Sequence, residues 1–206
     1  MDRSHSQLSD EQLVDAFQPG HLAAYDELVS RWQSKIRGAV WRVLGSTEDA
    51  ADITQEAFLR AFRGLKAFKR EAKFSSWIYQ IALNLCRDSL RRKKGKSYVS
   101  LDEPEPQIPA LVSKGPSPLE LSEGSQLADR VRMAIQKLSE DQREVIILKE
   151  YEGLTFAEIA ETLGLPTSTV KTRLYRGLVE MKQHLAKDGV TSASAIHDSN
   201  EPRDRT

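Results

Sequence analysis

The ten residues FKREAKFSSW, from Phe68 to Trp77, combine two kinds of side chain that rarely share a surface. Three of them are aromatic, and four are charged, of which only Glu71 is an acid. Aromatic rings stack on unpaired bases and cations bind phosphates, so this composition suits a single strand of nucleic acid. The alternative is that the rings pack on their own domain, and we expect this for one or two of them.

Charge is sorted along the chain, although the total is balanced by thirty Lys and Arg residues against thirty Asp and Glu residues. Between Arg60 and Lys96, twelve basic residues stand against two acids, which gives a local balance of +10. Between Leu101 and Asp129, six acids stand against one lysine, which gives −5. This separation indicates a polyanionic partner for one part of the chain, which the net charge alone does not predict.

Residues 153–182 carry start and stop signals for two short helices, in the segment GLTFAEIAETLGLPTSTVKTRLYRGLVEMK. Thr155 followed three residues later by Glu158 is a capping box, which predicts a helix start. Gly164 supplies the left-handed conformation that ends a helix, and Pro166 fits just before or in the first turn of the next one. The segment therefore predicts a helix-turn-helix, whose second helix inserts into the major groove of DNA.

The second of these helices carries polar side chains on the face opposite Val170. Arginine can contact a base edge with two hydrogen bonds, and lysine can contact a phosphate as a point charge. The candidate contacts to a duplex are Ser168, Thr169, Lys171, Thr172, Arg173, Tyr175 and Arg176. An ordinary helical hairpin with a solvated basic face is the alternative. The combination of Ala160, Gly164 and Val170 at their spacings argues against it.

The remaining periodic segments all predict helices. Apolar residues recur at three- and four-residue spacings over 22–44, and a shorter helix capped near Ser9 and ended by Pro19-Gly20 precedes them. A third helix is expected over DAADITQEAFLRAFRGL, and a fourth from Ser75 or Ser76 to about Arg92, with a serine hydroxyl as its cap. No segment alternates with the period of two that a strand would show. The fold class is therefore all-α.

Periodicity stops over residues 95–125, where five of the eight prolines fall among acidic residues. Proline removes amide donors and fixes φ, so we expect an extended, flexible linker there. The linker separates two predicted helical domains, residues 9–94 and residues 126–186. The tail, residues 187–206, has too few apolar side chains to offset its ordering entropy, and we expect it to be disordered.

Other function classes find no support in the sequence. The single Cys86 excludes a disulfide framework and CxxC motifs, and the four histidines lack metal-ligand spacing. No Gly-rich phosphate loop or nucleophile elbow is present. We therefore expect no enzymatic activity, no metal and no cofactor. The first residues lack the apolar core of a signal peptide, and no apolar run approaches the ~20 residues of a membrane span, so we expect a cytoplasmic protein without membrane contact.

Three stretches together point to one family. In order along the chain they are DITQEAFLRAFR, FKREAKFSSWIYQIALNLCRD and YEGLTFAEIAETLGLPTSTVKTRLYRG. Through these stretches the chain resembles the extracytoplasmic-function (group 4) sigma factors of bacterial RNA polymerase over roughly residues 9–186. The resemblance implies two domains, region 2 and region 4, tied by a flexible linker. It also implies three partners: core RNA polymerase through its β′ clamp coiled coil and β flap, promoter DNA, and an anti-sigma factor.

The resemblance assigns roles within region 2. The helix matching DITQEAFLRAFR docks on the β′ clamp coiled coil in the family, which implicates Asp52, Gln55, Glu56, Leu59, Arg60 and Arg63. A polar face with one exposed leucine agrees with an interface, and a solvated stripe is the alternative.

In the family the loop matching FKREAKFSSW opens the promoter's −10 element and holds a flipped base. This implicates Phe68, Lys69, Arg70, Lys73, Phe74, Trp77 and Asn84. Many members have Gly at the position of Arg70, so this loop departs from the family pattern.

By the same resemblance, region 4 reads the −35 duplex, and the acidic linker runs through the polymerase's active-centre and RNA-exit channels. A solvated tether explains the linker's composition equally well. Melting costs a few kcal/mol per extruded base and stacking returns ~1 to 3 kcal/mol, so we expect the free protein to bind DNA weakly. Two other functions stay open: a helix-turn-helix regulator that binds its operator as a dimer, and a protein adaptor that binds polymerase without reading DNA.

Overall fold

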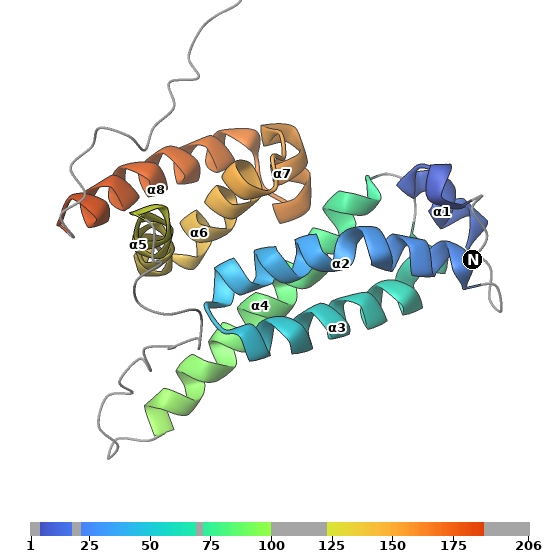
Figure 1. The fold of residues 1–206 in the computed structure, drawn as a ribbon, viewed down its shortest axis with the longest axis horizontal. Helices are drawn as coiled ribbons and strands as arrows, with labels where there is room; N and C mark the ends of the chain where they lie inside the picture. Colours follow the sequence, from blue (N-terminus) through green and yellow to red (C-terminus); the bar gives the residue numbers. More distant parts are fainter. Residues whose placement is uncertain (1–4, 18–21, 69–71, 100–122, 188–206) are drawn as a thin grey trace, which may run out of the picture.

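The computed structural model describes residues 5–17, 22–68, 72–99 and 123–187, and every regular element within these ranges is helical. The all-α prediction is therefore confirmed. Two helical units follow each other along the chain, and their helices pack on each other (Figure 1). We call residues 5–99 the N-terminal unit and residues 123–187 the C-terminal unit. The predicted tail apart from Lys187, the Pro19-Gly20 stop and most of the predicted linker lie outside the described residues; Lys187 is the last residue of α8.

The N-terminal unit begins with a 3-10 turn, His5–Gln7, and four α-helices follow: α1 (Asp10–Ala16), α2 (Ala23–Leu44), α3 (Thr47–Gly64) and α4 (Phe74–Val99). A 3-10 turn, Leu65–Ala67, follows α3 directly. Ser9 caps α1 with a capping box, and Ser46 accepts a hydrogen bond from the amide of Asp49 to cap α3. The apolar faces expected on α2 and α3 point into the core.

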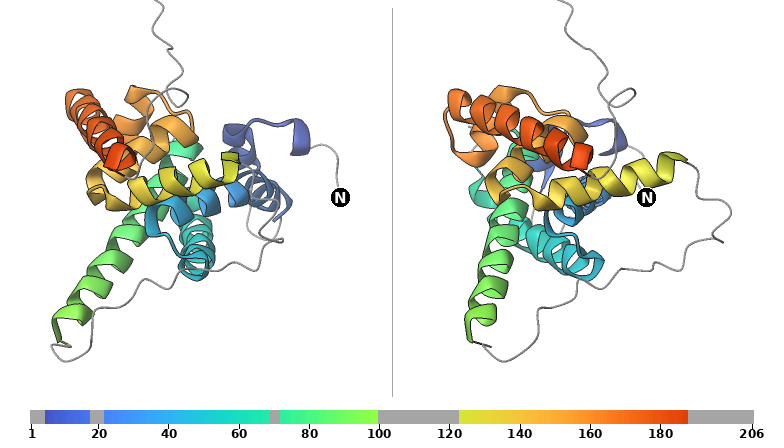
Figure 2. Two further views of the ribbon diagram at one scale, coloured as in Figure 1. Left: turned by 60° about the vertical axis from the view of Figure 1, so that its left-hand side comes forward. Right: turned by 90° about the vertical axis from the view of Figure 1, so that its left-hand side faces the viewer.

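Helix α4 differs from the expectation at both ends. It begins at Phe74, and the amide of Trp77 already donates to the carbonyl of Lys73 over 3.1 Å, so the serines lie within the first turn. It also continues beyond Arg92 to Val99, so its last turns extend away from the other helices (Figure 2). The basic run continues the helix because no proline interrupts it and Lys93 pairs with Asp49 at 2.6 Å.

The C-terminal unit contains α5 (Glu123–Lys137), α6 (Glu140–Ile146), a π-helical turn (Ile147–Tyr151), α7 (Phe156–Leu163) and α8 (Thr167–Lys187). The π-helical turn was not expected. Since α4 includes residues 95–99 and α5 includes residues 123–125, the segment between the units is shorter at both ends than predicted.

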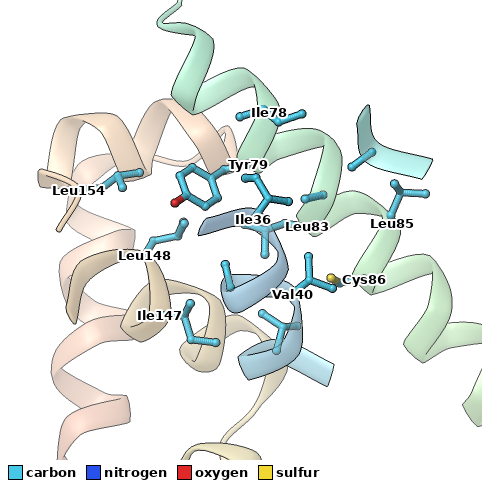
Figure 3. Close-up of a cluster of buried hydrophobic side chains, with 14 of the residues drawn as sticks. Ile36, Val40, Ile78, Tyr79, Leu83, Leu85, Cys86, Ile147, Leu148 and Leu154 are labelled. Carbon is cyan, nitrogen blue, oxygen red and sulfur yellow. The ribbon is translucent and has the colours of Figure 1, made fainter. Parts of the chain in front are cut away.

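One apolar core runs through both units, which the sequence did not predict. Ile36 and Val40 of α2 and Tyr79 and Leu83 of α4 lie beside Ile147, Leu148 and Leu154 of the C-terminal unit (Figure 3). All of these side chains are buried. Helix α7 packs on α4, while α5 packs on α2. The units therefore form a closed arrangement rather than two bodies joined only by a linker.

Candidate nucleic-acid interface

Helices α7 and α8 form the predicted helix-turn-helix. The Thr155 hydroxyl accepts from the amide of Glu158 at 3.2 Å, and the Glu158 carboxylate accepts from the amide of Thr155 at 2.9 Å. Gly164 has φ 64°, a left-handed conformation that suits glycine, and its amide closes the last turn of α7. Pro166 immediately precedes α8 and accepts from the amide of Val170 at 3.1 Å. All of these features match the expected motif.

The face of α8 that was predicted to contact a duplex is open to solvent. Tyr175 is 60% exposed, and Val170 and Leu174 on the opposite face are buried. Five of the seven candidates are exposed: Ser168, Lys171, Thr172, Tyr175 and Arg176. Thr169 is half-buried, and Arg173 is half-buried in an ion pair with Asp141 at 2.7 Å. The structure therefore brings the candidates onto one helix, with Arg173 already engaged inside the unit.

Of the three candidate rings near the start of α4, one is a core residue. Phe74 is fully buried, with its ring edge-on to Trp32 at 6.3 Å between centroids. Phe68 and Trp77 are half-buried and lie 4.7 Å apart with their planes tilted by 32°. The Phe74 ring fills the bundle in this arrangement and is not presented at a surface, so its contact with DNA stays a prediction. Phe68 and Trp77 remain as a paired aromatic surface.

The basic candidates beside these rings have different environments. Lys69 and Arg70 lie outside the described residues. Lys73 is exposed, and its ammonium binds the carboxylate of Glu158 in α7 at 2.7 Å. Asn84 is exposed, and its amide oxygen accepts from Arg87 at 2.9 Å. Two of the candidates are therefore already linked to side chains that join the units.

The carboxyl of Glu158 has an unusual pKa. The hydrogen bond from Lys73, then those from the amide and hydroxyl of Thr155, lower the pKa of Glu158 from 4.5 to about 2. A depressed carboxyl pKa contributes stability that is present above pH 4.5 and is lost as the pH falls toward 2. We expect the free energy of unfolding of wild type to exceed that of Glu158→Gln by about 1 kcal/mol at pH 7. The difference is modest because Lys73 is well solvated. Urea unfolding of both proteins between pH 7 and pH 2 should show this difference disappear on acidification; a constant difference would contradict the assignment.

The candidate polymerase face of α3 is exposed as predicted. Leu59 is 43% exposed between the polar candidates, and Arg60 pairs with Glu56 of the preceding turn at 2.8 Å. Asp52, Gln55 and Arg63 are exposed as well. The six candidates therefore share the outer surface of one helix.

An apolar groove between α2 and α3 continues this face, and sequence reasoning missed most of it. Its apolar lining includes Leu22, Tyr25, Val29, Phe58, Leu59 and Phe62. Phe62 is 37% exposed, three residues after Leu59. This helical spacing could have identified it as part of the same surface. The Tyr25 hydroxyl donates to the carbonyl of Phe58, and this bond holds the Tyr25 ring as a wall of the groove. Burial raises the pKa of Tyr25 to about 12.

Sequence reasoning also missed a group of polar side chains between the units. The Glu144 carboxylate is only 1% exposed and accepts two hydrogen bonds from the Arg87 guanidinium, at 2.8 and 2.5 Å. Burial raises the pKa of the Glu144 carboxyl, and the hydrogen bonds from Arg87 oppose that shift. The Tyr79 hydroxyl donates to Glu152, which also pairs with Arg42. No local pattern marks these residues, because each partner lies in the other unit.

Arg143 is a buried cation that the sequence did not single out. Its guanidinium donates to the carbonyls of Ile135, Gln136 and Leu138 at the end of α5 and to that of Val43 at the end of α2. Burial lowers the pKa of Arg143. The side chain thus closes the last turn of α5 and joins it to the N-terminal unit.

Within the described part of the chain, His, Cys, Asp and Glu side chains form no group of three or more that could hold a metal ion. No helix in the same ranges is both long and apolar enough to span a membrane.

Comparison with known proteins gives matches to both units. The family model "Sigma-70 region 2" matches residues 28–96, and "Sigma-70, region 4" matches residues 128–181. The chain is 35% identical over 170 residues to the ECF RNA polymerase sigma factor SigW of Bacillus subtilis, covering 81% of this chain and 91% of SigW. It is 33% identical over 174 residues to the ECF RNA polymerase sigma-E factor of Escherichia coli K12, covering 82% of this chain and 91% of that protein.

Solved structures share the fold. CnrH, in complex with the cytosolic domain of CnrY, matches with a TM-score of 0.62 and 24% identity over 87% of this chain and 96% of that one. The sigma factor RpoE of Bartonella quintana, in complex with the anti-sigma factor NepR, matches with a TM-score of 0.61 and 22% identity, covering 80% of this chain and 98% of that one. With both family models in order and relatives above 30% identity along nearly their whole length, the chain belongs to the extracytoplasmic-function family of RNA polymerase sigma factors and directs transcription initiation.

Proposed function

We propose that the two units divide promoter recognition between them and that the chain has no catalytic chemistry of its own. The C-terminal unit, as region 4, reads the −35 duplex, and the N-terminal unit, as region 2, melts and captures the −10 strand. The observation that carries this assignment is the exposed polar face of α8 on a helix-turn-helix. Cations and hydroxyls there match the donors that contact base edges and phosphates in the major groove.

Core polymerase docks on the outer face of α3 and the adjoining groove. The groove offers Leu22, Leu59 and Phe62 as exposed apolar anchors, and the polar candidates of α3 surround them. An apolar centre with a polar rim is the usual composition of a protein interface. An anti-sigma factor that covered this surface would prevent docking, and we expect such a partner. The chain acts in the cytoplasm, where the polymerase is.

The test of this function is initiation by core polymerase on a promoter library, with and without the chain. Arg176→Ala should reduce promoter selectivity by about 5- to 100-fold, since one bidentate base contact carries ~1 to 3 kcal/mol of discrimination. Lys171→Ala should weaken binding to all promoters alike, since a phosphate contact carries no sequence information. Lys182→Ala is the matched control, because it removes an exposed cation from the same helix beyond the reading turns. Defined transcripts that did not require the chain would refute the function. Unchanged selectivity of Arg176→Ala together with unchanged promoter binding by Lys171→Ala would favour the adaptor.

A second prediction concerns strand opening. Trp77→Ala removes one ring of the pair with Phe68, so we expect duplex binding to persist and promoter opening to fall by about 5- to 100-fold, the equivalent of ~1 to 3 kcal/mol per stacked base. Permanganate reactivity of unpaired thymines in the polymerase complex measures the opening. Trp77→Phe keeps a ring and is the control. Equal reactivity for Trp77→Ala and wild type would exclude Trp77 from strand capture.

A further inference from the structure

Helix α4 presents a row of hydrogen-bond donors to the C-terminal unit. Lys73, Ser76, Tyr79, Arg87 and Lys94 all have a side-chain partner there. The row begins just before the first turn of α4 and spans most of the helix; Ser76 and Tyr79 are buried, and Arg87 is half-buried. Ammonium, guanidinium and hydroxyl groups are the donors with which proteins bind the phosphate backbone of nucleic acids.

Every one of these donors meets a carboxylate of the C-terminal unit. Glu158 binds Lys73 at 2.7 Å, Glu161 binds the Ser76 hydroxyl at 3.0 Å, and Glu140 binds Lys94 at 2.6 Å. Glu152 and Glu144 accept from Tyr79 and Arg87. Five carboxylates thus follow five donors along one helix, and the Arg87 fork binds both oxygens of its partner as it would bind two oxygens of a phosphate.

We propose that these five carboxylates, which we call the acid row, stand in for DNA phosphates and compete with a promoter strand for the same donors of α4. This inference rests on the proposed function of the N-terminal unit. The closed arrangement then holds the −10 surface inactive in the free chain, and opening requires that phosphates replace the acid row. Lys73 has both roles: it is a candidate contact to the promoter strand, and in the closed arrangement it binds Glu158 of the acid row.

The competition leaves the other DNA surface accessible. Ser168, Lys171, Thr172, Tyr175 and Arg176 on the reading face of α8 are exposed in the same arrangement. In a closed chain, therefore, the surface for the separated strand is covered and the surface for the duplex is not. Its apparent affinity for a single strand is the intrinsic affinity reduced by the fraction of open molecules.

The test uses the full chain without polymerase and a labelled single-stranded −10 oligonucleotide, with binding followed by fluorescence anisotropy. Glu158→Gln with Glu161→Gln removes two charges from the acid row, and glutamine preserves the capping box of α7. The double variant should bind the strand about 3- to 10-fold more tightly, because weakening one exposed ion pair, Lys73–Glu158, and one partly buried hydrogen bond, Ser76–Glu161, shifts the closed fraction by roughly that factor. Its radius of gyration in small-angle scattering should also increase.

The matched control is Glu150→Gln with Glu180→Gln, which removes two acids from the same unit without touching the donors of α4. It should change strand affinity by less than about 2-fold, the size of a nonspecific charge effect. A double variant that binds no better than this control overturns the inference. Thermal unfolding of both variants checks that the fold is kept.

Initiation by wild type with core polymerase separates the two hypotheses. If wild type fails to initiate, the proposed function is wrong. If wild type initiates but the acid-row variant binds the strand no more tightly than its control, the proposed function is kept and only this inference is wrong.

Discussion

Replacing Arg87 with alanine is expected to lower the free energy of unfolding by about 3 kcal/mol. The substitution leaves the Glu144 carboxylate buried between the units without its partner, and removing one member of a buried ion pair costs about 3 to 5 kcal/mol. Arg87 is partly exposed, so we expect the lower end of this range. Urea unfolding at pH 7 measures the loss, and hydrogen exchange should show faster opening where α4 meets α6.

Two comparisons make this prediction specific. Lys94→Ala breaks a similar contact, with Glu140, but Lys94 is largely exposed, so the expected cost is under about 1 kcal/mol. Arg87→Met combined with Glu144→Met removes both charges and should recover most of the stability, since apolar side chains often replace a buried pair at little cost. If Arg87→Ala lowered the free energy of unfolding no more than Lys94→Ala does, the Glu144 carboxylate would not be buried as the structure has it.

Phe74→Ala is expected to lower the free energy of unfolding by about 3 to 5 kcal/mol, the usual cost of deleting a buried aromatic side chain. Phe74 lies at the first turn of α4, packed against Trp32 and Trp77, with no exposed surface. The cavity would loosen the start of α4, where the paired rings sit. Thermal or urea unfolding measures the cost.

Phe74→Leu is the control for this prediction, because it keeps most of the buried volume and should cost about 1 kcal/mol. Phe68→Ala, at a half-buried position, should cost less than Phe74→Ala. If Phe74→Ala were as stable as wild type and selectively defective in promoter opening, the ring would act on DNA rather than in the core.

Local signals predicted the helix-turn-helix and most helix starts. The capping boxes at Ser9 and Thr155 and the left-handed Gly164 involve residues within a few positions of each other, so a single sequence reveals them. The buried faces of α2, α3 and α4 followed from helical periodicity in the same way. The match of α8 to a reading helix, with Val170 and Leu174 inward, needed nothing more than this pattern.

The features that could not be predicted from the sequence depend on contacts between residues far apart in the chain. Arg87 and Glu144 are 57 residues apart, and Arg143 and Val43 are 100 residues apart, so no local pattern reports their pairing. The burial of Phe74 depends on Trp32 in α2, and the extension of α4 depends on partners such as Asp49. The sequence indicated the residues of the candidate −10 surface but not that Glu158 of the other unit binds Lys73 there.

Arg143 makes the junction between the units uneven. On the α2 and α5 side its guanidinium is held by neutral backbone carbonyls, whereas on the α4 side both partners of most contacts are charged. Raised ionic strength screens the exposed charged contacts and leaves buried hydrogen bonds largely unaffected. The charged contacts along α4 should then weaken, while the hydrogen bonds of Arg143 and the shared apolar core keep the units together.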